Sequence, residues 1–98
     1  MKTTVVNIRH EECDVYIGRG RAGTVSLWGN PFPLERGMVR GSTLPRFRAL
    51  MEERLRENPE FWVNELRKLK GKKLGCFCKP HPCHGDVIAE YIERYVPD

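Results

Sequence analysis

The sequence lacks any long apolar run. Residues 1–10 mix charged, hydroxyl and β-branched side chains, whereas a signal peptide or a membrane-spanning helix needs a continuous apolar stretch. We therefore expect no membrane partner and a cytoplasmic location. Repeats and low-complexity tracts are also absent, so the pattern is that of an ordinary globular chain.

The chain is too short for two hydrophobic cores. It has 98 residues, so we expect residues 1–98 to form a single domain. Its hydrophobic fraction of 40% and charged fraction of 31% are ordinary for a globular protein and argue against disorder. A bound metal ion or a homodimer interface would add stability to so small a domain.

Basic residues outnumber acidic ones, with 17 Lys and Arg against 13 Asp and Glu and a net charge of +4. This excess is compatible with a phosphate-bearing partner, either a nucleotide or a nucleic acid. Many of the charges lie between Arg46 and Lys73, where they alternate with apolar residues at helical spacing. That pattern is typical of solvated helix faces and does not by itself indicate a binding surface.

Only four cysteines are present, and no two of them form a Cys-x-x-Cys pair. In a cytoplasmic protein we expect them to be thiols or metal ligands and not disulfides. Cys13 stands apart beside two glutamates and is interpreted as an incidental thiol.

The hydrophobic pattern predicts three strands and three helices. In chain order these are strands at Thr3–Ile8 and Asp14–Arg19, a helix capped by Ser42 and running to Glu57, a helix from Phe61 to Leu69 ended by Gly71, a strand at Lys73–Cys78, and a last helix marked by Val87 to Tyr95. Gly20 to Gly41 is predicted to be a long ordered loop, with a short strand suggested at Thr24–Trp28. The order predicts a small α/β domain of two or three layers. We expect a short mixed or partly parallel sheet, packed by about three helices and Rossmann-like in part.

Sulfur and imidazole donors crowd the stretch before the last helix. Cys76 and Cys78 are two residues apart on a predicted strand, so both side chains leave the same face. Cys83 and His84 follow at the start of the helix. Three thiolates and one imidazole, with His81 as the alternative to His84, would suit a tetrahedral zinc site. The single close cluster differs from the two separated ligand pairs of an ordinary zinc finger.

The same stretch also suits a catalytic or anion-binding site. A helix start presents free backbone N–H groups and the positive end of the helix dipole, and this lowers the pKa of a cysteine placed there. Cys83 is then the candidate nucleophile, His84 the proton carrier and Asp86 the orienting group. Ligands of open α/β sheets bind beyond the carboxyl ends of the strands, where this stretch falls. Spacing alone does not make Cys83 and His84 a dyad, because adjacent residues need not face each other.

Two further interpretations of the cysteines stay open. Cys76 and Cys78 are equally explained as small buried hydrophobic residues of a core strand. In a thiol redox role, either of them could instead resolve an oxidised Cys83.

A second candidate binding segment lies earlier in the chain. Gly18 and Arg19 end the second predicted strand, with a glycine that permits close approach and a cation that can hold a phosphate or carboxylate. The spacing is not that of a dinucleotide-binding loop or a P-loop. The turn Asn30-Pro31-Phe32 adds an amide for a base or sugar and a ring that either stacks on a ligand or packs over the sheet edge.

Three motifs occur in order along the chain. They are Val15-Tyr16-Ile17-Gly18-Arg19, then Trp28-Gly29-Asn30-Pro31-Phe32, then Leu74-Gly75-Cys76-Phe77-Cys78 with Pro80 and Cys83-His84-Gly85-Asp86. Together they resemble a family of bacterial, archaeal and phage proteins described as domain of unknown function 4326, over about Val5 to Arg94. The resemblance implies a compact α/β fold but no reaction. It also implies a shared site built from Gly18, Arg19, Asn30, Pro31, Phe32, Cys76, Cys78, Cys83 and His84.

The chain departs from that family's pattern in two places. Phe77 stands where the family commonly has Trp, which keeps the aromatic ring. Ser42-Thr43-Leu44-Pro45 replaces an acidic turn and puts only the start of the central helix in doubt.

Two function classes therefore remain. The first is an enzyme or binding domain for a nucleotide, nucleobase or sugar-phosphate. Here Arg19 would hold the anion, Asn30 and Phe32 the ring, and Cys83 with His84 the reacting centre. The second is a non-catalytic, zinc-stabilised module that binds nucleic acid or a protein partner.

Overall fold

The computed structural model describes residues 2–18, 27–29, 42–76 and 83–97. Its elements in chain order are β1 (Thr4–Asn7), β2 (Val15–Tyr16), α1 (Leu44–Glu57), α2 (Pro59–Leu69), β3 (Lys73–Cys76) and α3 (His84–Tyr95). This is the predicted order of strands and helices, and the α/β class is confirmed. Residues 24–26 of the short strand suggested at Thr24–Trp28 lie outside the described residues, while Leu27 and Trp28 form a turn.

The three described strands form one parallel sheet with the order β1-β3-β2. Val5 of β1 and Val15 of β2 lie on either side of Leu74 in the central strand β3. Parallel strands need a long crossover connection, and α1 and α2 supply one between β2 and β3. The described strands are thus parallel throughout, and their carboxyl ends share one edge of the sheet.

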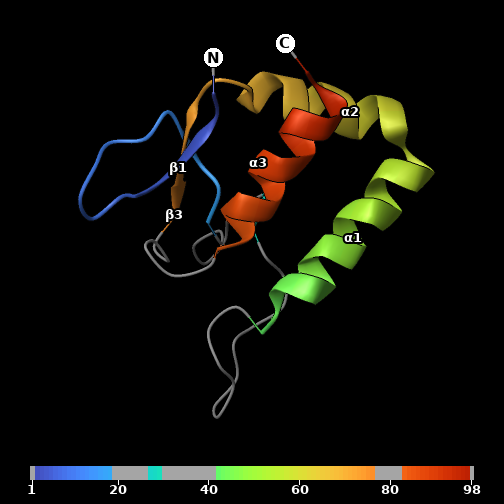
Figure 1. Ribbon diagram of the computed structural model, residues 1–98, viewed down its shortest axis with the longest axis horizontal. Coiled ribbons are helices and arrows are strands. Elements are labelled where there is room, and N and C mark those ends of the chain that lie inside the picture. The colour runs from blue at the N-terminus through green and yellow to red at the C-terminus, as the bar shows by residue number, and fades with distance from the viewer. Residues whose placement is uncertain (1, 19–26, 30–41, 77–82, 98) are drawn as a thin grey trace.

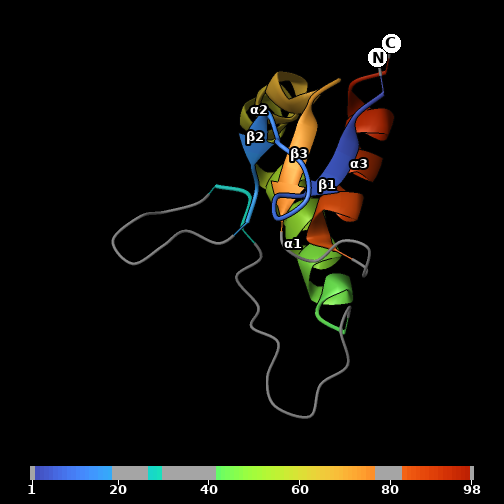
Figure 2. The same cartoon turned by 90° about the vertical axis from the view of Figure 1, so that its left-hand side faces the viewer.

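All three helices lie on one face of the sheet, as the two views in Figures 1 and 2 show. The opposite face of β3 is covered by the segment between β1 and β2. A Cβ atom on Gly75 would lie 2.4 Å from Cys13 Sγ and 2.6 Å from Ile8 Cγ2. Cys13 therefore packs directly on the central strand, and a glycine at position 75 makes room for it.

The start of α1 departs by one residue from the sequence-based boundary, whereas α2 ends at Leu69, before Gly71, as predicted. Ser42 is the cap predicted for α1, but the structure has Thr43 in that position. The Thr43 carbonyl accepts the first helical hydrogen bond, which the Phe47 N–H donates at 3.1 Å. Gly71 follows the cap of α2 with φ of 77°, a left-handed conformation that favours glycine. Its N–H donates to Thr3 Oγ1 at 2.9 Å, which ties the end of α2 to the start of β1.

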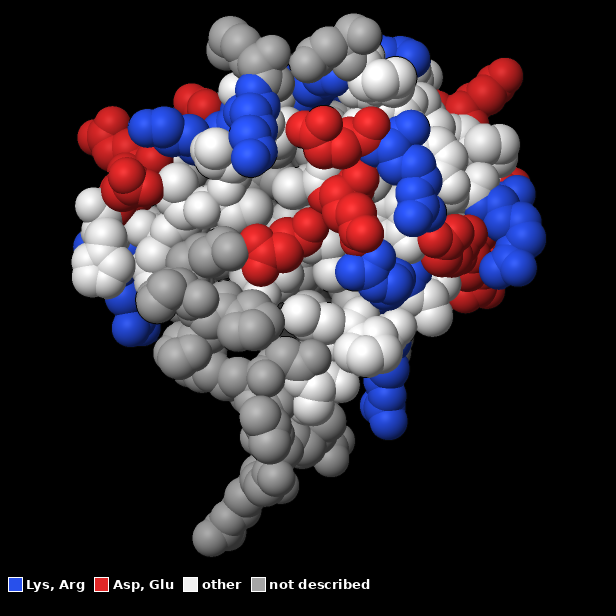
Figure 3. Space-filling view, in the orientation of Figure 1, with Lys and Arg blue, Asp and Glu red and all other residues white. Residues whose placement is uncertain are grey.

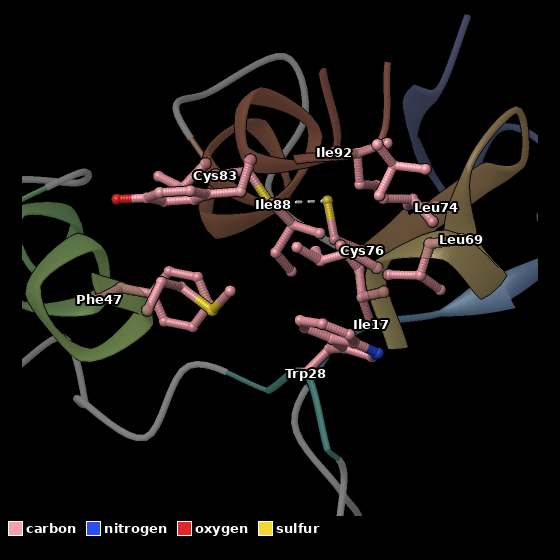
Figure 4. Close-up of a cluster of buried hydrophobic side chains, with 14 of the residues drawn as sticks. Ile17, Trp28, Phe47, Leu69, Leu74, Cys76, Cys83, Ile88 and Ile92 are labelled. Carbon is pink, nitrogen blue, oxygen red and sulfur yellow. Dashed lines mark hydrogen bonds between the residues drawn. The ribbon is translucent and has the colours of Figure 1, made fainter. Parts of the chain in front are cut away.

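The hydrophobic core fills the space between the sheet and the helices (Figure 4). Its fully buried members come from every layer: Ile17, Phe47, Met51, Leu66, Leu74, Cys76, Cys83, Ile88, Tyr91 and Ile92. In the described part of the chain, no helix is long and apolar enough to cross a membrane.

Candidate functional site

The carboxyl ends of β2 and β3 meet the amino end of α3 at one edge of the sheet (Figures 1 and 2). Cys76 is the last residue of β3, Ile17 follows β2, and His84 is the first residue of α3. The fold thus brings three separated segments to the place where ligands bind in open α/β sheets.

Two cysteine side chains point toward each other at this edge (Figure 4). The Cys83 thiol donates to Cys76 Sγ, with the sulfurs 3.1 Å apart, and each residue is only 1% exposed. A disulfide bond would bring the sulfurs to about 2.05 Å, so the contact is between two thiols. The side chains of Cys76 on β3 and Cys83 at the cap of α3 therefore form one pair of contacting thiols.

His84 occupies a fixed position beside this thiol pair. Its Nε2 lies 2.7 Å from the Ile17 carbonyl oxygen, and a carbonyl oxygen can only accept, so Nε2 carries the hydrogen. In the neutral ring Nδ1 then holds the lone pair, and Nδ1 lies 3.7 Å from Cys83 Sγ. The ring also packs edge-on against Phe47, with centroids 5.2 Å apart. Adjacent in sequence, Cys83 and His84 do face each other.

The backbone at the start of α3 is closed by a capping box. Cys83 is the cap: its Sγ accepts from the Gly85 N–H at 3.4 Å, and its own N–H donates to Asp86 Oδ2 at 3.2 Å. The Asp86 N–H donates to the Cys83 carbonyl at 3.0 Å. The expected free N–H groups at this helix start are therefore engaged at Cys83, Gly85 and Asp86. The Asp86 carboxylate, predicted to orient the imidazole, accepts from the backbone of Cys83.

Gly85 lets the helix start approach the sheet. A Cβ atom there would lie 2.8 Å from both Ile17 Cδ1 and Val5 Cγ1, closer than side chains normally approach. The absence of a side chain brings the first turn of α3 down onto β1 and the end of β2. That approach is what allows His84 to reach the Ile17 carbonyl.

The other predicted site residues are only partly described. A Cβ atom on Gly18 would meet the Tyr16 hydroxyl at 2.2 Å, so the tyrosine ring folds over this glycine. Trp28 is 5% exposed and packs edge-on against Trp62, with centroids 5.6 Å apart. The remaining candidates, which are Arg19, Asn30, Pro31, Phe32, Cys78 and His81, lie outside the described residues.

The described residues alone do not form a metal site. No group of three or more His, Cys, Asp or Glu side chains in residues 2–18, 27–29, 42–76 and 83–97 is placed to hold a metal ion. The predicted zinc ligands thus include a described thiol pair, and Cys78 falls outside what the structure describes.

Comparison with known proteins identifies the family. The model of the family described as Domain of unknown function (DUF4326) matches residues 2–94. The chain belongs to the DUF4326 family. It is also 36% identical over 94 residues to an "Uncharacterized 12.4 kDa protein in nrdA-td intergenic region" of Enterobacteria phage T4, covering 96% of this chain and 81% of that protein. No solved structure matches the chain significantly. The resemblance carried by the three motifs is thereby confirmed.

Three groups that help to build the site in this DUF4326 chain are not among the site residues predicted from the sequence. The Ile17 carbonyl is a backbone group, which no residue type marks. Phe47 lies inside the helix predicted to run to Glu57, and helical spacing does not indicate which side chain it contacts. Gly85 did leave a signal, since glycine is unfavourable inside a helix by about 1 kcal/mol relative to alanine and its presence in a first turn indicates a close approach.

Proposed function

We propose that this chain binds or acts on a nucleotide, nucleobase or sugar-phosphate, with Cys83 and His84 as its reacting centre. One observation carries the proposal: Cys83 Sγ lies 3.7 Å from His84 Nδ1, and His84 Nε2 is held 2.7 Å from the Ile17 carbonyl. A thiol beside a base that a third group orients is the arrangement used in nucleophilic catalysis. In this chain a backbone carbonyl takes the orienting role that the sequence suggested for Asp86.

The contacts around Cys83 favour loss of its proton. The Cys83 S–H, which donates to Cys76 Sγ, would first rotate toward His84 Nδ1. Transfer of its proton to Nδ1 would then leave a thiolate beside an imidazolium whose other nitrogen is already hydrogen-bonded to the Ile17 carbonyl. The Gly85 N–H, which donates to Cys83 Sγ at 3.4 Å, and the positive end of the α3 dipole both stabilise negative charge on sulfur. Because these groups would stabilise a thiolate at Cys83, we assign Cys83 the role of nucleophile.

The ligand's anionic part is assigned to Arg19 and not to the start of α3. The Gly85 and Asp86 N–H groups there already have acceptors, and the Asp86 carboxylate adds negative charge that repels a phosphate. Arg19 directly follows Gly18 in the sequence, and Gly18 lies two residues beyond the end of β2. Asn30 and Phe32 remain the sequence-based candidates for a base or sugar.

A ligand screen tests this proposal. Thermal unfolding is measured with a panel of nucleotides, nucleosides, free bases and sugar-phosphates, and we expect at least one class to raise the melting temperature. Arg19→Ala should abolish that rise for phosphorylated ligands. Lys68→Ala removes the same charge from the last turn of α2 and should leave the rise unchanged. A panel without any stabilising compound, or equal effects of the two variants, contradicts the assignment.

A second candidate function rests on the thiol pair. A zinc ion with Zn–S bonds of about 2.3 Å would hold two sulfurs about 3.8 Å apart, so Cys76 and Cys83, now 3.1 Å apart, need only a small separation. Cys78 and either His81 or His84 would complete the set predicted from the sequence. Metal analysis of purified protein separates the two functions: stoichiometric zinc that is lost in Cys78→Ser but kept in Cys13→Ser supports the module, and metal-free folded protein contradicts it.

The charged side chains on the helical face give little support to nucleic-acid binding there. Figure 3 shows basic and acidic side chains interleaved there. Arg48 pairs with Glu90, and Arg94 Nη1 lies 3.3 Å from Glu52 Oε1. This is the solvated helix face that the sequence indicated, so we place a small ligand ahead of a nucleic acid among the proposed partners.

A further inference from the structure

The contact between Cys76 and Cys83 has a chemistry of its own. We propose that the two residues are a redox-active dithiol, which a hydroperoxide oxidises to an intramolecular disulfide. The inference goes beyond the proposed function, because it requires neither a nucleotide-like ligand nor a metal ion. It also selects one partner for Cys83, where the sequence left Cys76 and Cys78 as equal alternatives.

The two sulfurs are already placed for bond formation. They lie 3.1 Å apart, so closing a disulfide of about 2.05 Å shortens the separation by about 1 Å. The side chains approach from different elements, the end of β3 and the cap of α3, and point toward each other in Figure 4. Seven positions separate the two residues in the chain, so the bond would close a short loop between β3 and α3.

The surroundings decide which sulfur reacts first. Cys83 Sγ receives the Gly85 N–H and faces His84 Nδ1, so it has a group to stabilise its thiolate and a base to take its proton. Cys76 and Cys83 both belong to the hydrophobic core cluster, whose apolar surroundings disfavour a thiolate, so the two contacts of Cys83 decide between them. Cys83 is therefore the attacking thiolate and Cys76 the resolving thiol.

The reaction balances in two steps. The Cys83 thiolate attacks one oxygen of the hydroperoxide and breaks the O–O bond. This gives a sulfenic acid on Cys83 and releases the second oxygen as alcohol or water after it takes up a proton. The Cys76 sulfur then attacks Cys83 Sγ, the S–S bond forms, and the sulfenic oxygen leaves as water with the Cys76 proton. Two thiols are oxidised by two electrons and one peroxide is reduced.

Cys13 provides a matched control inside the same chain. Its Sγ approaches the central strand from the opposite face of the sheet, over Gly75, while Cys76 faces the helices. The sheet thus separates Cys13 from the dithiol, and oxidation at Cys76 and Cys83 should leave Cys13 a thiol.

The test uses the full chain, reduced, desalted and treated with one equivalent of hydrogen peroxide. Thiols are alkylated with a light reagent, the protein is reduced, and newly exposed thiols are alkylated with a heavy one. We expect heavy label on Cys76 and Cys83, light label on Cys13 and Cys78, and an intact mass lower by two hydrogens before reduction. The double variant Cys13→Ser, Cys78→Ser, which keeps both dithiol residues, should show the same mass loss.

A second variant follows the intermediate. Cys76→Ala should stop the reaction at a Cys83 sulfenic acid that dimedone traps, without the loss of two hydrogens. Heavy label on Cys78 in place of Cys76 would overturn the proposal. So would a double variant that gains oxygen or forms intermolecular dimers without closing a disulfide. Neither result bears on nucleotide binding, so this proposal and the proposed function fail separately.

Discussion

His84 Nε2 lies 2.7 Å from the Ile17 carbonyl oxygen, so a single side-chain hydrogen bond ties the first turn of α3 to the end of β2. Ile17 is fully buried, and its N–H continues the sheet by donating to the Gly75 carbonyl at 2.9 Å. The imidazole is thus held by a rigid part of the molecule, which fixes the direction in which Nδ1 faces Cys83.

Replacing His84 with Phe should destabilise the fold by about 1–3 kcal/mol, because the buried Ile17 carbonyl loses its donor. His84→Gln retains an N–H donor and should lose less. The free energy of unfolding in urea measures both effects. His10→Phe, at an exposed histidine, is the control and should change it by about 0.5 kcal/mol at most. Equal stability of the His84→Phe and His10→Phe proteins would show that the hydrogen bond contributes nothing.

Gly85→Ala should destabilise the protein by about 1–3 kcal/mol, even though alanine is the better helix former. The added Cβ would press on Ile17 and Val5 at 2.8 Å and lift the start of α3 from the sheet. Thermal denaturation measures the loss. Glu93→Ala, at an exposed position of the same helix, should leave the midpoint nearly unchanged. A Gly85→Ala protein that melts at or above the wild-type temperature contradicts the close approach.

The Tyr91 phenol should ionise late. Burial, and then its hydrogen bond to Glu52 Oε1 at 2.6 Å, raise its pKa from 10.0 to about 12. The folded state therefore holds this proton more tightly than the unfolded chain. The associated stability is complete below pH 10.0 and is lost as the pH rises toward about 12.

Ultraviolet titration of tyrosinate absorbance checks this expectation. The wild type should show a late component that is missing in Tyr91→Phe and that moves to lower pH in Glu52→Gln. A titration curve that Tyr91→Phe alters only in its early part would contradict the assignment.

Arg54→Met should leave stability unchanged or raise it by up to about 1 kcal/mol. The guanidinium lies 4.6 Å from the centre of the Trp62 ring, and its Nη1 is buried with no hydrogen-bond partner in the described part of the structure. Burial also lowers the Arg54 pKa. Methionine keeps the contact with the ring and removes the unsatisfied donor. Urea unfolding provides the measurement, with Arg56→Met at an exposed neighbouring position as the control, and a loss above about 1 kcal/mol in Arg54→Met alone would contradict this expectation.

The fold was largely predictable because periodicity reports which face of an element is buried. Phe47, Met51 and Leu55 recur at helical spacing and are the buried residues of α1. The position of Cys83 and His84 at the start of a helix was predictable for the same reason. Their mutual contact was not, since residue spacing does not fix side-chain rotamers.

The remaining parts of the site depend on groups that the sequence does not distinguish. The Ile17 carbonyl is chemically identical to every other carbonyl in the chain. The N–H groups at the start of α3 looked available for an anion, but Asp86 and the Cys83 side chain engage part of them. Cys76 and Cys78 are equivalent by alternation on a strand. The structure places Cys76 Sγ 3.1 Å from Cys83 Sγ, and Cys78 lies outside the described residues.

The most direct test of the reacting centre is the alkylation rate of each cysteine at neutral pH, resolved by mass spectrometry in the wild type and in His84→Gln. Iodoacetamide is small enough to reach the buried thiols when this edge of the sheet opens locally. The alkylation rate of Cys13 reports any general change in the reagent's access to thiols. We expect Cys83 to react faster than Cys76, and we expect His84→Gln to slow the alkylation of Cys83 by about tenfold or more while leaving that of Cys13 unchanged. Equal Cys83 rates in the two proteins would contradict the claim that Cys83 and His84 act together.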